Sequence, residues 1–213
     1  MTHPPDRQGR LLAVGDIHGC LASLEHLLDQ VCPRSEDRMV FLGDYIDRGP
    51  DSAGVIELLL KFAEQHPYTV FLRGNHEQMF LDFISDRDPL PFLANGGDLT
   101  LASYQKRDLW PIPRRHLKFF EPLRDFFETP EFIFVHAGLR PGIPLVEQNP
   151  DDLLWIRDAF LSSPADWGKT VVFGHTPHHQ PLMTDGRIGL DTGCVYGRRL
   201  TCCDVHSKQM WSV

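Results

Sequence analysis

The chain has 213 residues, a formal net charge of -8, 42% hydrophobic residues and 23% charged residues. This composition indicates a soluble globular protein that is long enough for one substantial core. No stretch of about 18 apolar residues occurs, so neither a transmembrane helix nor a membrane partner is expected. The acidic charge argues against a nucleic-acid partner, because proteins that bind the phosphate backbone usually carry a basic face.

The cysteines and the N-terminus predict a cytoplasmic protein. The five cysteines are odd in number and irregularly spaced, which favours free thiols in a reducing compartment over a set of disulfides. No charged-then-apolar leader opens the sequence. Residues 1–10 are polar and contain proline, and they predict a flexible N-terminal tail. Residues 11–213 contain no repeat or linker and predict a single domain.

The first half of the chain alternates strand and helix patterns. Short apolar runs predict buried strands, and apolar residues at helical spacing predict helices between them. The expected strands are 11–15, 39–42 and 69–72, and the expected helices are 21–31, 51–65 and 77–84. Such alternation predicts a largely parallel start to the sheet.

The second half is less regular. Residues 86–130 contain a turn at Asn95-Gly96-Gly97 and one expected helix at 116–127. Further strands are expected at 132–135 and 171–173, with a helix at 151–161 between them. Two last strands, 188–190 and 200–205, are expected to pair as a hairpin.

Polar residues follow five of these strands, at the point where each strand ends. The segments are GDIHG (15–19), GDYIDRG (43–49), GNHE (74–77), VHAG (135–138) and GHT (174–176). Glycine permits the tight turns and close backbone approach that such segments need. A lone Gly-Asp is more often a turn than a ligand, but five such segments in order predict one shared site at the carboxyl edge of the sheet.

The residue types in these segments fit a metal centre. Two aspartates, one asparagine and three histidines offer mixed oxygen and nitrogen coordination, which suits manganese, iron or zinc better than calcium. Six ligands are too many for one catalytic zinc and about right for two ions that share a carboxylate. The candidate ligands are Asp16, His18, Asp44, Asn75, His136 and His175.

The set GDIHG, GDYIDRG, RGNHE, HAG and GHT resembles the phosphoprotein phosphatase (PPP) family of metallophosphoesterases. It is most similar to the small bacterial and phage-type serine/threonine protein phosphatases, from Leu11 to about Val205. The resemblance implies a calcineurin-like metallophosphoesterase fold, which is an α/β sandwich of two mixed β-sheets flanked by helices.

The resemblance also implies how the metal ligands divide. Asp16 and His18 would hold one ion, and Asn75, His136 and His175 would hold the other. Asp44 would bridge the two ions together with a hydroxide, which would attack phosphorus as the nucleophile.

Six further residues are assigned expected roles beside the metal ligands. His76 would be the general acid, oriented by Asp47, because a carboxylate keeps an imidazole protonated and aimed. Arg48 and Arg157 would bind substrate phosphate. Arg73 would either touch phosphate or support the site, while Glu77 is expected to be a cap rather than a ligand.

These implications predict a phosphomonoester hydrolase, specifically a serine/threonine protein phosphatase acting on a phosphorylated protein or a small phosphoester. Two divalent ions are expected as cofactors, with manganese favoured in vitro and iron or zinc as alternatives. The oligomeric state stays open.

Three alternatives compete with this prediction. A symmetrical bis(5'-nucleosyl)-tetraphosphatase typically lacks the second Asp of GDxxDRG and has GNHD, whereas this chain has Asp47 and Glu77. A nuclease of the wider superfamily commonly has Gly-His-x-His, whereas His175 is followed by Thr176 and Pro177. A non-catalytic metal-binding scaffold is disfavoured because every expected ligand is present.

Overall fold

Two five-stranded mixed sheets form the centre of the protein. The computed structural model describes residues 9–213. The first sheet has the strand order β10-β9-β1-β2-β3, and the second has the order β4-β5-β6-β8-β7. The strands are β1 (Leu11–Val14), β2 (Arg38–Phe41), β3 (Val70–Phe71), β4 (Phe126–Glu128), β5 (Phe132–Val135), β6 (Thr170–Phe173), β7 (Leu182–Thr184), β8 (Arg187–Gly189), β9 (Thr201–Asp204) and β10 (Met210–Ser212).

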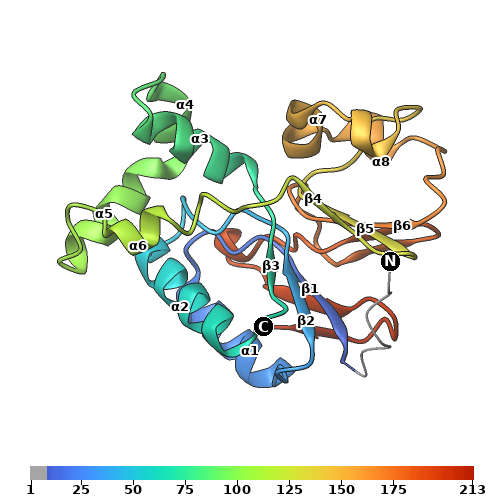
Figure 1. Cartoon of the computed structure of the whole chain (residues 1–213), viewed down its shortest axis with the longest axis horizontal. Coiled ribbons are helices and arrows are strands. Elements are labelled where there is room, and N and C mark those ends of the chain that lie inside the picture. Colours follow the sequence, from blue (N-terminus) through green and yellow to red (C-terminus); the bar gives the residue numbers. More distant parts are fainter. Residues whose placement is uncertain (1–8) are drawn as a thin grey trace, which may run out of the picture.

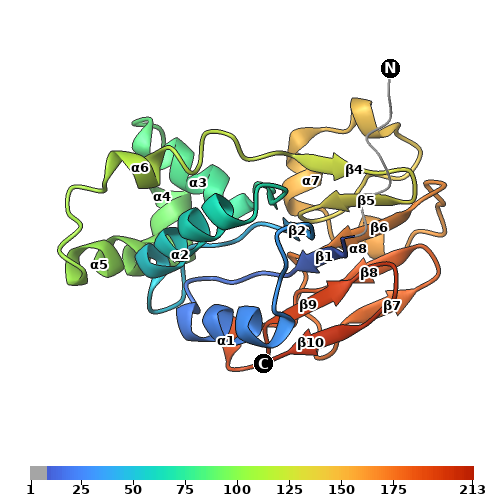
Figure 2. The ribbon, with the colours of Figure 1, turned by 60° about the horizontal axis from the view of Figure 1, so that its bottom comes forward.

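Helices flank both sheets. In Figure 1, α1 (Leu21–Val31) and α2 (Ser52–Gln65) lie along the first sheet, while α7 (Pro150–Trp155) and α8 (Asp158–Leu161) lie over the second. The segments between β3 and β4 project beyond the sheets as a helical group next to α2 (Figure 2). The remaining helical segments are α3 (Asn75–Ile84), α4 (Leu90–Phe92), the π-helical turn η1 (Leu93–Gly97), α5 (Asp98–Lys106), α6 (Arg114–Leu117), η2 (Leu145–Glu147) and η3 (Cys194–Tyr196).

Three apolar clusters hold the layers together. Because side chains alternate across a strand, Leu12 of β1 packs toward α1 and α2, while Ala13 packs toward the second sheet. The cluster between the sheets includes Phe134 of β5, and the outer cluster of the second sheet joins Val135 to Phe160 of α8. Full burial of each such Leu, Val or Phe stabilises the fold by about 1.5–3 kcal/mol.

The predicted fold class, two mixed sheets flanked by helices, is confirmed. The alternation of strands and helices in the first half also gives the expected parallel pairs, β1 with β2 and β2 with β3. These pairs bring the carboxyl ends of three strands to one edge of the first sheet.

The predicted hairpin of 188–190 with 200–205 is wrong. β8 pairs with β6 and β7 in the second sheet, whereas β9 pairs with β1 and β10 in the first. β8 forms a hairpin with β7 just before it and β9 forms one with β10 just after it, while their other neighbours, β6 and β1, belong to different sheets. The order of the strands in the sequence therefore predicted the wrong pairing, because the connection from β8 to β9 passes from the second sheet to the first.

The middle of the chain also departs from expectation. The helix expected at 116–127 is limited to α6, and Phe126–Glu128 is β4, since Pro122 cannot continue a helix. Helix α5 was not predicted. The helix expected at 151–161 is broken into α7 and α8 by non-helical backbone at Ile156 and Arg157.

The predicted tail lies mostly outside the described residues, which begin at Gly9. Arg10, the last residue of the predicted tail, donates hydrogen bonds to Asp37, which lies 27 positions later. In the part of the chain that the structure describes, no helix is long and apolar enough to cross a membrane.

Candidate active site

The six predicted ligand residues lie at the carboxyl ends of strands from both sheets. Because the sheets pack face to face, the ends of these strands meet at one rim. All six side chains are buried. They follow β1 (Asp16 and His18), β2 (Asp44), β3 (Asn75), β5 (His136) and β6 (His175).

Left-handed backbone is concentrated at this rim. The φ angle is 46° at His18, 53° at Asp44 and 61° at His175. Such a conformation costs a residue with a side chain about 1–3 kcal/mol and persists only where the surroundings hold it. Gly43, with φ of 103°, permits a close crossing of chains, since a Cβ there would lie 2.6 Å from the backbone nitrogen of Gly74.

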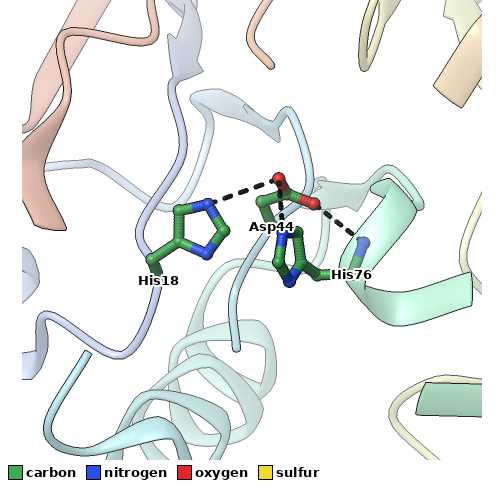
Figure 3. A group of neighbouring side chains, drawn as sticks. All are labelled: His18, Asp44 and His76. Carbon is green, nitrogen blue, oxygen red and sulfur yellow. Dashed lines mark hydrogen bonds and ion pairs between the residues drawn. The ribbon is translucent and has the colours of Figure 1, made fainter. Parts of the chain in front are cut away.

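Asp44 lies between two groups of histidines. Its Oδ2 is 3.4 Å from Nε2 of His18 and 4.0 Å from Nε2 of His76 (Figure 3). Its Oδ1 is 3.4 Å from Nε2 of His136. With His175, these side chains make two groups whose potential ligand atoms lie within 4.8 Å of one another, and both groups include Asp44. A carboxylate shared in this way suits two neighbouring cations.

Asn75 completes the second group with an amide oxygen. Its Oδ1 lies 2.9 Å from Nε2 of His136 and 3.0 Å from Nδ1 of His175. Two of the imidazole rings are oriented by backbone carbonyls, since Nδ1 of His136 is 2.8 Å from the oxygen of Leu42 and Nδ1 of His18 is 2.8 Å from that of Ile46. A carbonyl only accepts, so each Nδ1 donates its proton and each Nε2 presents a lone pair to the site.

The charge state of these groups fits divalent transition-metal ions. Burial lowers the pKa of His18 and of His175 to about 3, so both imidazoles are neutral. Burial alone would raise the pKa of Asp44, but the surrounding histidines, His136 foremost, bring it below its ordinary value. Nε2 of His76 is buried without a hydrogen-bond partner among the described residues, as expected beside a bound ion or substrate.

Asp16 lies outside both groups. Its two carboxylate oxygens accept from the backbone N–H of His175, each at 3.1 Å. Burial raises the pKa of Asp16, and the nearby Asp191 and Asp44 raise it further. Gly174 makes this approach possible, since a Cβ there would lie 2.1 Å from Oδ1 of Asp16. A cation at the rim would compensate this accumulation of negative charge.

His76 and Asp47 form a buried pair. Nδ1 of His76 lies 2.7 Å from Oδ2 of Asp47, and both side chains are fully buried. Since a carboxylate accepts, Nδ1 donates and Nε2 faces Asp44. His76 stands in the first turn of α3, where its backbone N–H donates to Oδ1 of Asp44 at 3.2 Å. This arrangement suits proton transfer to a leaving group.

Two of the three predicted phosphate-binding arginines flank the site on opposite sides. Nη1 of Arg48 lies 3.1 Å from Nε2 of His18, and Nε of Arg157 lies 3.1 Å from Nε2 of His175. Arg157 was expected on a helix but stands in the break between α7 and α8. Arg73 instead donates to Asp125 at 3.0 Å and to Gln78 at 2.8 Å, which favours a supporting role.

Glu77 caps α3 and also ties three motif loops together, in line with the cap expected from the sequence. Its buried carboxylate accepts from the backbone N–H groups of Asp44, Tyr45 and Gly74 at 2.8–2.9 Å. A second support, the hydroxyl of Thr100, contacts Asp47 from 53 positions away, and no sequence motif indicates it.

Residues 9–205 match the calcineurin-like phosphoesterase family. The chain belongs to this family. It is 28% identical to a bis(5'-nucleosyl)-tetraphosphatase PrpE (asymmetrical) of Oceanobacillus iheyensis, over 94% of this chain and 90% of the relative. It is 27% identical to a protein of the same name from Anoxybacillus flavithermus, over 88% of this chain and 87% of that one.

Solved structures of family members agree with the fold. A protein described as a candidate diadenosine tetraphosphatase superposes with a TM-score of 0.78 at 28% identity, covering 99% of this chain and 95% of that one. A protein serine/threonine phosphatase from Saccharomyces cerevisiae superposes with a TM-score of 0.63 at 14% identity, covering 97% of this chain and 80% of that one. The second likeness shows a common fold alone.

The comparisons overturn the predicted serine/threonine protein phosphatase and its phosphorylated protein substrate. The full-length relatives are named asymmetrical tetraphosphatases, which also differs from the symmetrical alternative. Asp47 and Glu77 had favoured a monoesterase, but both are buried and hold His76 and the backbone of the motif loops. Their carboxylates are occupied within the protein, so they carry little information about which ester is cleaved.

Proposed function

We propose that this chain hydrolyses dinucleoside polyphosphates and splits a bis(5'-nucleosyl) tetraphosphate asymmetrically into a nucleoside monophosphate and a nucleoside triphosphate. The observation that carries the phosphoester chemistry is the pair of buried ligand groups that share Asp44. The names of the full-length relatives support the substrate class.

Two divalent ions belong to this proposal, with manganese as the ion for activity in vitro and iron or zinc as alternatives. When bound, such ions polarise the phosphoryl group and lower the pKa of a coordinated water. The residues proposed to hold them are Asp16, His18, Asp44, Asn75, His136 and His175.

The chain's other residues would bind and orient the substrate. Arg48 and Arg157 stand on opposite sides of the site, next to His18 and His175, so one phosphate group would meet a guanidinium from each side. His76 would protonate the leaving oxygen through Nε2, and Asp47 would hold its ring. Arg73 is proposed to steady the loop after β3, because Asp125 and Gln78 already occupy its guanidinium.

The proposed leaving group limits how much His76 contributes. A departing nucleoside triphosphate is a terminal phosphate with a pKa of about 6, so it leaves with little help from an acid. An alkoxide needs far more protonation. We therefore expect the acid to matter less for the anhydride than for an alkyl phosphate.

The test is product analysis with diadenosine tetraphosphate. Purified protein is treated with EDTA, reconstituted with Mn²⁺ and assayed by anion-exchange chromatography. We expect AMP and ATP in equal amounts, with no turnover in EDTA. Two molecules of ADP would contradict the asymmetrical cleavage, and the absence of turnover by protein that has bound metal would contradict hydrolysis.

The single-domain organisation and the cytoplasmic location stay predictions.

A further inference from the structure

Helix α5 and the turn before it contact the proposed acid pair and phosphate-binding loop. Thr100, on the first half of α5, is 1% exposed, and its hydroxyl lies beside Asp47. Gly96, in the preceding turn, lies against the backbone of Arg48. Asp47 and Arg48 both have left-handed backbone, with φ of 71° and 65°, so this part of the loop requires external support.

The hydroxyl of Thr100 makes two complementary bonds to one residue. It accepts from the backbone N–H of Asp47 at 2.9 Å and lies 2.7 Å from Oδ1 of the same side chain. The Ser52 hydroxyl is also within 2.9 Å. Because a hydroxyl has one proton and a carboxylate only accepts, we assign that proton to Asp47. Oδ2 of Asp47 is then left to receive Nδ1 of His76 at 2.7 Å.

Gly96 supports the neighbouring residue. Its carbonyl accepts from the backbone N–H of Arg48 at 3.3 Å. Its φ is 95°, and a Cβ on Gly96 would lie 2.8 Å from the nitrogen and 3.1 Å from the Cα of Arg48. A side chain here would therefore displace the start of the Arg48 side chain, whose guanidinium reaches His18.

We propose that Thr100 and Gly96 are positioning residues for the reaction, Thr100 for the acid pair through Asp47 and Gly96 for the phosphate-binding Arg48. Neither residue touches the substrate. This inference rests on the proposed roles of His76 and Arg48. It gives helix α5 and the turn before it, which lie outside all the motifs, an indirect role in catalysis.

A second hydroxyl on α5, that of Ser103, provides a control that distinguishes positioning of Asp47 from docking of the helix. Ser103 is 2% exposed and lies one turn further along α5. Its hydroxyl accepts from the backbone N–H of Ala53 at 3.0 Å and lies 3.1 Å from Asp51, so it fastens α5 to α2 without reaching Asp47. Loss of Ser103 would weaken the docking of the helix and leave the acid pair untouched.

The experiment compares Thr100→Val, Thr100→Ser and Ser103→Ala in the manganese-loaded protein. Substrates are an alkyl phosphate, an aryl phosphate and diadenosine tetraphosphate, and melting temperature and metal content are recorded. Thr100→Val should lower kcat on the alkyl phosphate by about 10- to 100-fold, the worth of a hydrogen bond to a charged group. The loss should be smaller on the other two substrates, KM should stay constant, and Thr100→Ser should restore the rate.

Equal losses of kcat on all three substrates in Thr100→Val would overturn the role of Thr100. So would a loss of kcat in Ser103→Ala that is selective for the alkyl phosphate. If the wild-type protein cleaves aryl phosphate but not the dinucleotide, the proposed function fails while the comparison of leaving groups still tests Thr100.

Gly96 is tested by Gly96→Ala beside Gly186→Ala. Both glycines have positive φ, 95° and 84°, but nothing lies within 4 Å of a Cβ on Gly186, in the turn between β7 and β8. The two variants thus carry similar backbone strain. Gly96→Ala should raise KM for each substrate by about tenfold through displaced Arg48, whereas Gly186→Ala should leave KM unchanged. An unchanged KM in Gly96→Ala would overturn this role.

Discussion

The two sides of the active site differ in how their side chains are held. On the side of the first sheet, His18 and Asp47 contact buried backbone or hydroxyl partners, and His76 contacts Asp47. On the side of the second sheet, His136 is also oriented by a backbone carbonyl, but the ring nitrogens of His175 have hydrogen-bond partners only in Asn75 and Arg157 among the described residues. Its neighbour Trp155, with ring centroids 5.9 Å apart, is 44% exposed.

This difference suggests that the first side carries out the chemistry and that the second side influences which substrate binds. The first side is a rigid, buried hydrogen-bond network, which suits groups that must keep one geometry during catalysis. The second side carries Trp155, an exposed side chain from the segment between β5 and β6, outside the motifs. Substrate preference often resides in such loops on a fixed scaffold. Variants of the acid pair on the first side should therefore act on kcat, and variants of Arg157 on the second side should act on KM.

The largest expected effect comes from Asp44, the residue common to both sides. In Asp44→Asn, one carboxylate oxygen is replaced by an amide nitrogen and the negative charge that both ligand groups share is lost, so activity should fall by about 10³-fold or more. Metal content by elemental analysis should fall as well. Full metal content together with wild-type turnover would show that Asp44 does not join the two groups.

A change on the first side should come next. His76→Asn should keep its metal and lose kcat by about 10²–10⁴-fold on an alkyl phosphate, the usual worth of a general acid. The loss on diadenosine tetraphosphate should be smaller, because its leaving group is weakly basic. Steady-state kinetics on both substrates gives the comparison, and equal losses would argue against the acid role.

A change on the second side should act on binding. Arg157→Ala removes a guanidinium that lies 3.1 Å from His175, and KM for the tetraphosphate should rise by about 10- to 100-fold. The matched control is Arg140→Ala, since Arg140 is an exposed arginine that pairs with Asp152 of α7. If both variants raise KM alike, the effect belongs to α7 and the comparison of the two sides fails.

The smallest effect on activity is expected away from both sides, at Asp37. Burial alone would raise the pKa of this carboxyl, but hydrogen bonds from Arg10 and Arg34 lower it to about 2. A depressed pKa contributes stability above about pH 4, and this contribution is lost as the pH falls toward 2.

Asp37→Asn should therefore lower the free energy of unfolding at pH 7 by about 1–2 kcal/mol, with kcat unchanged. Denaturant titrations of both proteins at pH 7 and pH 3 measure this difference in the free energy of unfolding. The deficit should shrink at the lower pH, and a constant deficit would mean that packing rather than charge is lost.

The sequence by itself determined the parallel start of the first sheet and the candidate ligands. Both depend on short-range patterns: alternation of strand and helix brings strand ends to one edge, and each motif carries its own glycine turn. The six residues from Asp16 to His175 accordingly meet at one rim. Glu77 was also readable as a cap, because its main partners lie in the turn just before it and in the preceding motif.

Only the tertiary structure decided the partners of β8 and β9, the break that frees Arg157 and the contact of Thr100 with Asp47. The pairing of β9 with β1 and the contact of Thr100 with Asp47 join residues far apart in sequence, whose association is set by packing of whole layers and leaves no local pattern. The substrate was missed for a related reason. The motifs that resemble protein phosphatases are buried around the candidate ligand groups, so they indicate phosphoester chemistry and carry little information about the rest of the substrate.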